Sequence, residues 1–274
     1  MRSSLALLLA LLVAATSACE GEGPKTALGY SEDAKRAYDV AMQEYNAHNW
    51  LEAQMLLREV KRKYSYSKYA RMAELRIADA DLAQEKFSDA IREYKDFVHQ
   101  HRADTEDVEY ARSKIAEATV GEIPESFLLP ASEERDQATV VDAYKELKSY
   151  IADYPESKLT PHMRELLAQV VGRLVRHELY VARFYLNKDN YEGAVARIQY
   201  ALRNYGASME GPSAAAAGTG DLEAEALLLL GTVYLKMEKW EDARHAFQAI
   251  LKDYPNSPRS VAARNYLEYL KRQG

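Results

Sequence analysis

Alanine recurs in this chain at one place in a short pattern, and that recurrence constrains the fold more than any other feature. In each copy a large residue precedes the alanine by three positions and a bulky residue follows it by four. A small side chain at such a position lets two helices approach closely while the bulky neighbours fill the flanks. The pattern therefore predicts repeated pairs of antiparallel helices. The alanines are Ala53, Ala90, Ala143, Ala194 and Ala243.

A second small residue lies twelve positions before four of these alanines, as Ala41, Ala78, Ala182 and Gly231. These spacings resemble the tetratricopeptide repeat, a helix-turn-helix unit of about 34 residues. We predict an all-α fold, a right-handed superhelical solenoid of five tetratricopeptide-like repeats. A closing helix over residues 257–272 would cap it, because solenoid ends need a polar outer face.

Three stretches break the spacing of the repeats. The third repeat carries an insert at residues 121–136, a long helix is expected over residues 161–187, and residues 206–220 are rich in Ala and Gly and predict a surface loop. The predicted organisation is a signal at 1–18, a tether at 19–29, repeats at 30–120, the insert at 121–136, repeats at 137–205, the loop at 206–220, and the fifth repeat with its cap at 221–274.

The N-terminal segment reads as an export signal. Arg2 is followed by an uncharged apolar run over residues 5–15, which is too short to span a bilayer. Small residues then lead directly to Cys19, the single cysteine of the chain. This segment resembles a bacterial lipoprotein signal, in which that cysteine carries the lipid anchor. The alternative is an ordinary cleavable signal with an incidental cysteine.

The composition excludes several function classes. The formal net charge is −6, so no overall attraction to nucleic acid is expected. One cysteine permits neither an intrachain disulfide nor a cysteine-based zinc site. A Gly-rich phosphate loop and a G-x-S-x-G elbow are both missing from the sequence. We expect no enzymatic activity, no metal site and no cofactor apart from a covalent lipid on Cys19.

The first helices of successive repeats should line a concave groove suited to an extended peptide. Counting from Ala41 and Ala78, the inward positions hold aromatic, flexible and acidic side chains that would give adaptable contact area. Packing between repeats is an equally good explanation for any one of them. The predicted groove residues are Tyr38, Met42, Tyr45, Leu75 and Asp79.

A basic run, Lys61-Arg62-Lys63, has Lys68 and Arg71 just beyond it. Such a run is compatible with lipid headgroups or a partner protein. It is equally typical of a solvated helix end, where cations complement the helix dipole.

Four segments resemble the BamD (ComL-like) lipoprotein family of the bacterial β-barrel assembly machinery. They are residues 30–53, 108–111 (VEYA), 135–137 (RDQ) and 175–205, of which the last is the most specific. The resemblance implies a lipid-anchored scaffold at the periplasmic face of the outer membrane, within the BAM complex. Its implied partners are the BamA insertase, unfolded outer-membrane β-barrel proteins and, in some cases, other BAM lipoproteins.

Within the last segment, Arg197 matches a family arginine on the side that faces the insertase. There it could pair with a carboxylate across an interface, or it could be an exposed helix charge. The enlarged loop at 206–220 departs from the family pattern and lies in the same half of the chain. Alternatives to the family reading are another envelope repeat lipoprotein, such as a Tol-Pal coordinator or a secretin pilotin, and a periplasmic hydrolase.

Overall fold

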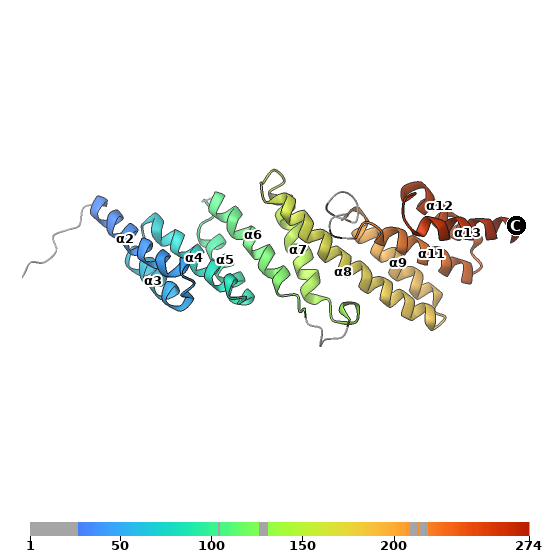
Figure 1. The fold of residues 1–274 in the computed structure, drawn as a ribbon, viewed down its shortest axis with the longest axis horizontal. Helices are drawn as coiled ribbons and strands as arrows, with labels where there is room; N and C mark the ends of the chain where they lie inside the picture. Colours follow the sequence, from blue (N-terminus) through green and yellow to red (C-terminus); the bar gives the residue numbers. More distant parts are fainter. Residues whose placement is uncertain are drawn as a thin grey trace, which may run out of the picture. The chain divides into compact units, whose positions relative to one another are not determined.

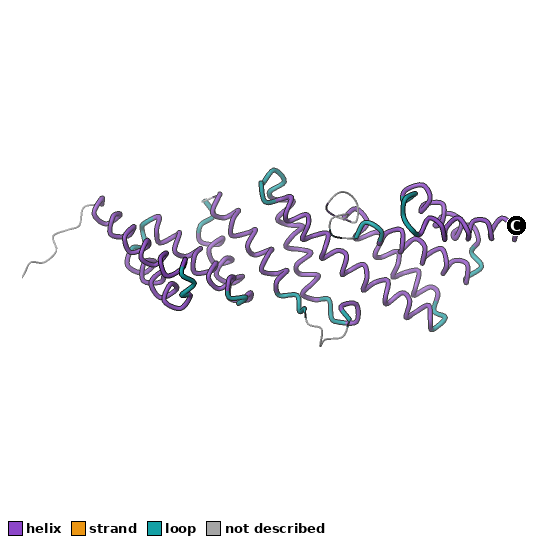
Figure 2. Tube along the Cα trace, viewed as in Figure 1, coloured by secondary structure: helices purple, strands orange, loops and turns teal. Residues whose placement is uncertain are grey.

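The structure is a computed structural model that describes residues 27–103, 105–125, 131–208, 213, 217 and 219–273. Across the described residues every regular element is helical, with eleven α-helices and two short 3-10 turns (Figure 2). The predicted signal at 1–18, Cys19 and most of the predicted tether lie outside the described residues. The chain divides into two compact units, residues 1–80 and 81–274, which are described separately.

The first unit is built on α2 (Ala27–Asn46), α3 (Trp50–Lys63) and most of α4 (Lys68–Ala83), with α2 packed against α3. The sequence analysis assigns residues 27–29 to the tether, whereas the structure includes them in α2. Gly29 suggests a flexible segment, but its cost of about 1 kcal/mol in a helix is small beside the packing of the turns that follow. The core contains Ala34, Tyr38, Ala41, Leu57, Val60, Tyr64, Ala73 and Ile77.

The second unit is a row of helices in which sequence neighbours pack together (Figure 1). The long α8 contacts α7 on one side and α9 on the other, and α11 packs on α9 and α12. The helices are α5 (Phe87–Gln100), α6 (Thr105–Gly121), α7 (Ala138–Asp153), α8 (Thr160–Asn187), α9 (Tyr191–Tyr205), α11 (Leu222–Lys236), α12 (Trp240–Asp253) and α13 (Arg259–Gln273).

The recurring alanines lie where the sequence pattern requires them. All five are fully buried, and so are the five bulky residues that follow them four positions later. The fifth repeat shows how tight the fit is, because a Cβ added to Gly231 would lie 2.4 Å from the Phe247 ring. The prediction of nested helix pairs is therefore confirmed for α2 with α3, α6 with α7, α8 with α9 and α11 with α12.

The turns between paired helices share one backbone conformation in four repeats. His48, Glu85, Asp189 and Glu238 each have a positive φ between 54° and 60°, and each lies five residues before the repeat's alanine. The two amides at each turn bond back to the preceding helix in a Schellman motif. The third repeat lacks this turn because its insert separates α6 from α7.

The long helix and the closing helix agree with the sequence analysis, whereas the insert and the loop are described only in part. A single helix, α8, covers the stretch predicted to be a long helix, and α13 closes the chain as the predicted cap. The insert contains a 3-10 turn, η1 (Ser132–Glu134), and begins after α6 has ended at Gly121. A second 3-10 turn, η2 (Gly206–Ser208), follows α9 at the start of the predicted loop, of which residues 209–212, 214–216 and 218 lie outside the described residues.

Candidate partner-binding surfaces

In the first unit, an arginine and a buried carboxylate share one face of α4. Arg76 Nη1 lies 2.7 Å from Asp79 Oδ2, and Asp79 is only 7% exposed. Arg76 also donates a hydrogen bond to the Tyr45 hydroxyl of α2. Burial is the main cause that raises the pKa of Tyr45, so this phenol stays neutral and can both donate and accept hydrogen bonds at physiological pH.

The five predicted groove residues differ in what they can offer to a ligand. Tyr38 and Leu75 are buried, and Tyr38 belongs to the core of the first unit, which favours packing as their role. Met42 and Tyr45 are half-buried against the same core and keep part of their surface accessible. Asp79 is buried beside Arg76.

Aromatic side chains that sequence reasoning did not select extend the Tyr45 surface. The Trp50 ring meets Tyr45 edge-on at 5.2 Å and stacks on the His48 ring at 5.0 Å. The sequence pattern assigns Trp50 only to the repeat, and the left-handed turn at His48 carries that imidazole to the ring. The three rings and Met42 form what we call the Tyr45 surface.

In the second unit, Arg197 has a partner within the chain. Its Nη1 donates to Glu178 Oε2 at 3.2 Å, which links α9 to α8. Glu178 is 7% exposed, whereas the Arg197 side chain is 43% exposed. The carboxylate that pairs with Arg197 is therefore internal, and it comes from the same segment that carries the family resemblance. The exposed part of the guanidinium retains donors for a second acceptor.

Tyrosine rings pack close to this pair. Tyr205 is buried and meets Tyr144 edge-on at 5.4 Å and Tyr200 at 6.0 Å. Burial, followed by hydrogen bonding to Tyr200, raises the pKa of Tyr205 far above its ordinary value, and the Glu178 charge adds to the shift. Tyr200 itself is exposed and lies one helical turn after Arg197, so the two side chains share a face of α9.

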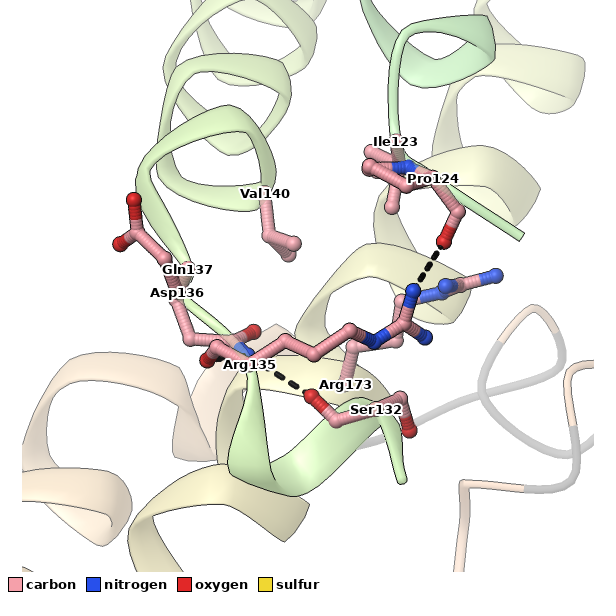
Figure 3. Close-up of a pocket in the computed structure, with 8 residues that line it drawn as sticks. All are labelled: Ile123, Pro124, Ser132, Arg135, Asp136, Gln137, Val140 and Arg173. Carbon is pink, nitrogen blue, oxygen red and sulfur yellow. Dashed lines mark hydrogen bonds between the residues drawn. The ribbon is translucent and has the colours of Figure 1, made fainter. Parts of the chain in front are cut away.

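The insert of the third repeat is fastened by residues of the RDQ segment. Arg135 Nη1 donates to the Pro124 carbonyl at 2.5 Å, and Gln137 Nε2 donates to the Ser132 carbonyl at 2.9 Å. Figure 3 shows Arg135 extended across the small pocket that these residues line. These contacts give this segment a structural role in holding the insert.

Helix α8 holds the same insert from the other side. His177 Nδ1 is 2.8 Å from the Glu133 carbonyl oxygen, and Arg173 pairs with Glu125. His177 and Glu178 are adjacent in sequence but face different neighbours, one the insert and the other α9. Their shared helix therefore couples the insert to the Arg197 pair.

Repeats four and five are joined by charged contacts that the sequence analysis did not find. Arg259 of α13 pairs with both Asp221 and Glu225, and Arg183 of α8 pairs with Glu225 as well. The residues are more than thirty positions apart, so sequence spacing gives no sign of them. This network connects α8, α11 and α13 next to the point where the predicted loop at 206–220 leads into α11.

Among the described residues, no group of three or more His, Cys, Asp and Glu side chains could hold a metal ion. The same residues include no helix long and apolar enough to cross a membrane.

Comparison with known proteins identifies relatives over most of the chain. The profile of a family described as outer membrane lipoprotein (YfiO) matches residues 31–219, and a tetratricopeptide-repeat profile matches residues 225–257. Outer membrane protein assembly factor BamD of Neisseria gonorrhoeae is 25% identical over 262 residues, with 92% of each chain covered. BamD of Xylella fastidiosa (strain 9a5c) is 23% identical over 258 residues, with 93% of this chain and 83% of the relative covered.

Among solved structures, a tetratricopeptide-repeat protein of Thermus thermophilus matches 86% of this chain and 98% of its own, at 15% identity and a TM-score of 0.35.

Proposed function

The chain belongs to the YfiO family of outer-membrane lipoproteins, and on that premise we propose that it is a non-enzymatic, lipid-anchored scaffold for the assembly of outer-membrane β-barrel proteins. The family match over residues 31–219 is the observation that carries the proposal, because it includes every repeat from the first to the fourth. Relatives named as assembly factors extend over nine tenths of the chain. They favour this function over a Tol-Pal coordinator, a secretin pilotin or a hydrolase.

The anchor is a lipid on Cys19, at the periplasmic face of the outer membrane. The signal-like segment and the position of the single cysteine support it. Mass spectrometry of the N-terminal peptide from membrane-purified protein should find acyl groups on Cys19. An unmodified cysteine, or a chain cut elsewhere, would remove the anchor from the proposal.

The insertase, a BamA-like protein, binds the C-terminal repeats through the face of α9 that carries Arg197 and Tyr200. The half-exposed guanidinium supports this role, since it has donors left after pairing with Glu178. Arg197→Glu is a poor test because it puts a second carboxylate against a buried one. Arg197→Gln removes the positive charge and the guanidinium but keeps a polar side chain that can still donate a hydrogen bond.

The test is co-purification of the insertase with variants that carry Arg197→Gln, Arg197→Lys or the control Arg203→Gln, on an exposed residue of the same helix. We expect the Gln variant to lose about tenfold in affinity, the Lys variant less, and the control nothing. Equal recovery in all three would remove Arg197 from the interface.

Unfolded clients bind the Tyr45 surface of the first unit. Accessible aromatic rings, a methionine and the Arg76 charge suit an extended peptide that ends in an aromatic residue and a carboxylate. A photo-crosslinker at Met42 should capture the C-terminal strand of a client during assembly. The matched control is a crosslinker at Met55, which is exposed on α3. Capture at Met55 alone would reject the Tyr45 surface.

A further inference from the structure

The end of the first unit where α3 leads into α4 is strongly cationic in an otherwise acidic chain. Residues 58–71 contain six basic side chains and one acidic one, Glu59, while the whole chain has a net charge of −6. We call this stretch the basic end. Its cations are Arg58, Lys61, Arg62, Lys63, Lys68 and Arg71.

Most of these charges point to solvent. Arg58, Arg62, Lys63 and Lys68 are exposed, while Lys61 lies 3.6 Å from Glu74 and is partly neutralised. Lys63 and Lys68 each lie over a tyrosine ring, at 5.5 Å and 5.2 Å, which keeps their stems near the surface of the unit. Capping of a helix dipole explains cations in the last turn of α3, but it does not explain Lys68 at the start of α4.

A fully exposed tyrosine lies between the two groups of cations. Tyr66 is 96% exposed, in the turn that joins α3 to α4. The Tyr66 ring gains nothing from burial within the unit, whereas tyrosine is favoured at the boundary between lipid and water.

This basic end is next to the start of α2. The Tyr30 hydroxyl donates to the Lys63 carbonyl at 3.5 Å, and the Tyr30 ring meets the Tyr64 ring edge-on at 5.4 Å. The antiparallel packing of α2 and α3 thus brings the basic end to within one helical turn of the first described residues of the chain.

The distance from there to the expected lipid is short. Seven residues lie between Cys19 and Ala27, the first residue of α2, so the two are eight positions apart. Even fully extended, eight residues reach only about 26–29 Å. A lipid on Cys19 would therefore hold the basic end close to the membrane surface. There its cations are attracted to anionic lipids, and the exposed tyrosine lies at the boundary that its side chain prefers.

We propose that the basic end is a second membrane contact that binds the phosphate-bearing headgroups of anionic phospholipids and orients the first unit at the bilayer. The proposal rests on the lipid anchor of the proposed function for its geometry. Its binding chemistry does not, since exposed cations attract an anionic surface whether or not a lipid is attached, by about 1 kcal/mol for each Lys or Arg. The lipid anchor and the headgroup binding by the basic end can therefore be rejected separately.

The experiment uses the mature chain from residue 19 with Cys19→Ala, so that no lipid contributes. Co-sedimentation is measured with vesicles of phosphatidylcholine alone and with vesicles that also contain phosphatidylglycerol, at low and at high salt. One variant carries Arg62→Gln, Lys63→Gln and Lys68→Gln. The control carries Lys145→Gln, Lys158→Gln and Lys252→Gln, which are exposed in the second unit and change the net charge equally.

We expect binding to the anionic vesicles that is lost at high salt, and about a hundredfold weaker partition for the basic-end variant, or roughly fivefold for each cation. The control should bind like the parent chain. No binding to anionic vesicles, equal binding to neutral ones, or equal loss in both variants would overturn the proposal. If Cys19 is unmodified in cells but the basic end still binds anionic vesicles, the lipid anchor is rejected and the headgroup contact is supported.

Discussion

Each unit holds an arginine against a buried carboxylate, but only one of the two pairs joins separate helices. Arg76 and Asp79 lie three positions apart on α4, whereas Arg197 and Glu178 connect α9 to α8. Both acids are 7% exposed, and the arginine side chains are 31% and 43% exposed. The pair within α4 orients Arg76, which contacts the neighbouring α2 through its hydrogen bond to the Tyr45 hydroxyl. The pair between α8 and α9 also contributes to the packing of the fourth repeat. An arginine–carboxylate pair therefore presents a charge at the surface of the first unit and helps to hold two helices together in the second.

The largest loss of stability should come from Arg197→Glu in the second unit. The change places a second carboxylate beside Glu178, which has little access to water, so we expect the free energy of unfolding to fall by about 2–3 kcal/mol. Urea unfolding followed by far-UV circular dichroism measures it. Arg203→Glu, on an exposed residue of the same helix, should cost less than about 0.5 kcal/mol, and a loss of similar size would contradict a specific role for the pair.

A smaller effect is expected from Arg76→Glu in the first unit. Asp79 would again face a like charge and the hydrogen bond from Arg76 to Tyr45 would be lost, but the ion pair itself lies within one helix, so the loss should be about 1–2 kcal/mol. The measurement is the same urea titration. The matched control is Arg36→Glu, because Arg36 also pairs with an acid three positions away but is well exposed. A cost for Arg76→Glu no larger than that of the control would show that burial of Asp79 does not matter.

Double-mutant cycles sharpen the comparison further. The cycle of Arg197→Gln with Glu178→Gln should give a coupling free energy of about 1 kcal/mol, and the cycle of Arg76→Gln with Asp79→Asn about 0.5 kcal/mol. The pair within α4 is the shorter and more buried of the two, so a larger coupling in the second unit would come from the contact that Arg197 and Glu178 make between two helices. Equal coupling in the two cycles would mean that joining two helices adds nothing to the strength of such a pair.

The smallest effect should be that of Arg197→Lys on stability. Lysine keeps the charge near Glu178 but lacks the planar fork, so the free energy of unfolding should change by less than about 0.5 kcal/mol. Thermal unfolding with this variant beside Arg197→Gln separates charge from geometry. A loss as large as that of Gln would show that the guanidinium geometry, and not the charge, stabilises α8 against α9.

The repeat pattern could be predicted because its determinants are local. Small residues such as Ala53 and Ala243 lie at fixed distances from their bulky partners, and each helix pair is short. The long helix α8 could be predicted for the same reason, since its residues contain no proline after the first turn.

The pairing of side chains could not be predicted in the same way. Arg197 and Glu178 are nineteen positions apart, and Arg259 and Glu225 thirty-four, so these contacts depend on how helices cross. Counting positions places Tyr38 on a groove, but counting does not distinguish a groove from the core beneath it. The left-handed residues of the turns could not be recognised from the sequence, because histidine, glutamate and aspartate occupy a conformation that glycine adopts most easily.

Those four left-handed turns have a consequence for how such a chain can change over time. Each turn is closed by hydrogen bonds within a few residues, so its geometry does not depend on which repeat surrounds it. Recombination at these points would join the front half of one repeat to the back half of another without shifting the register of the buried alanine. Exchange of half-repeats at these four turns would therefore leave the helix packing on either side intact, whereas the third repeat, which has an insert in place of the turn, offers no such joint.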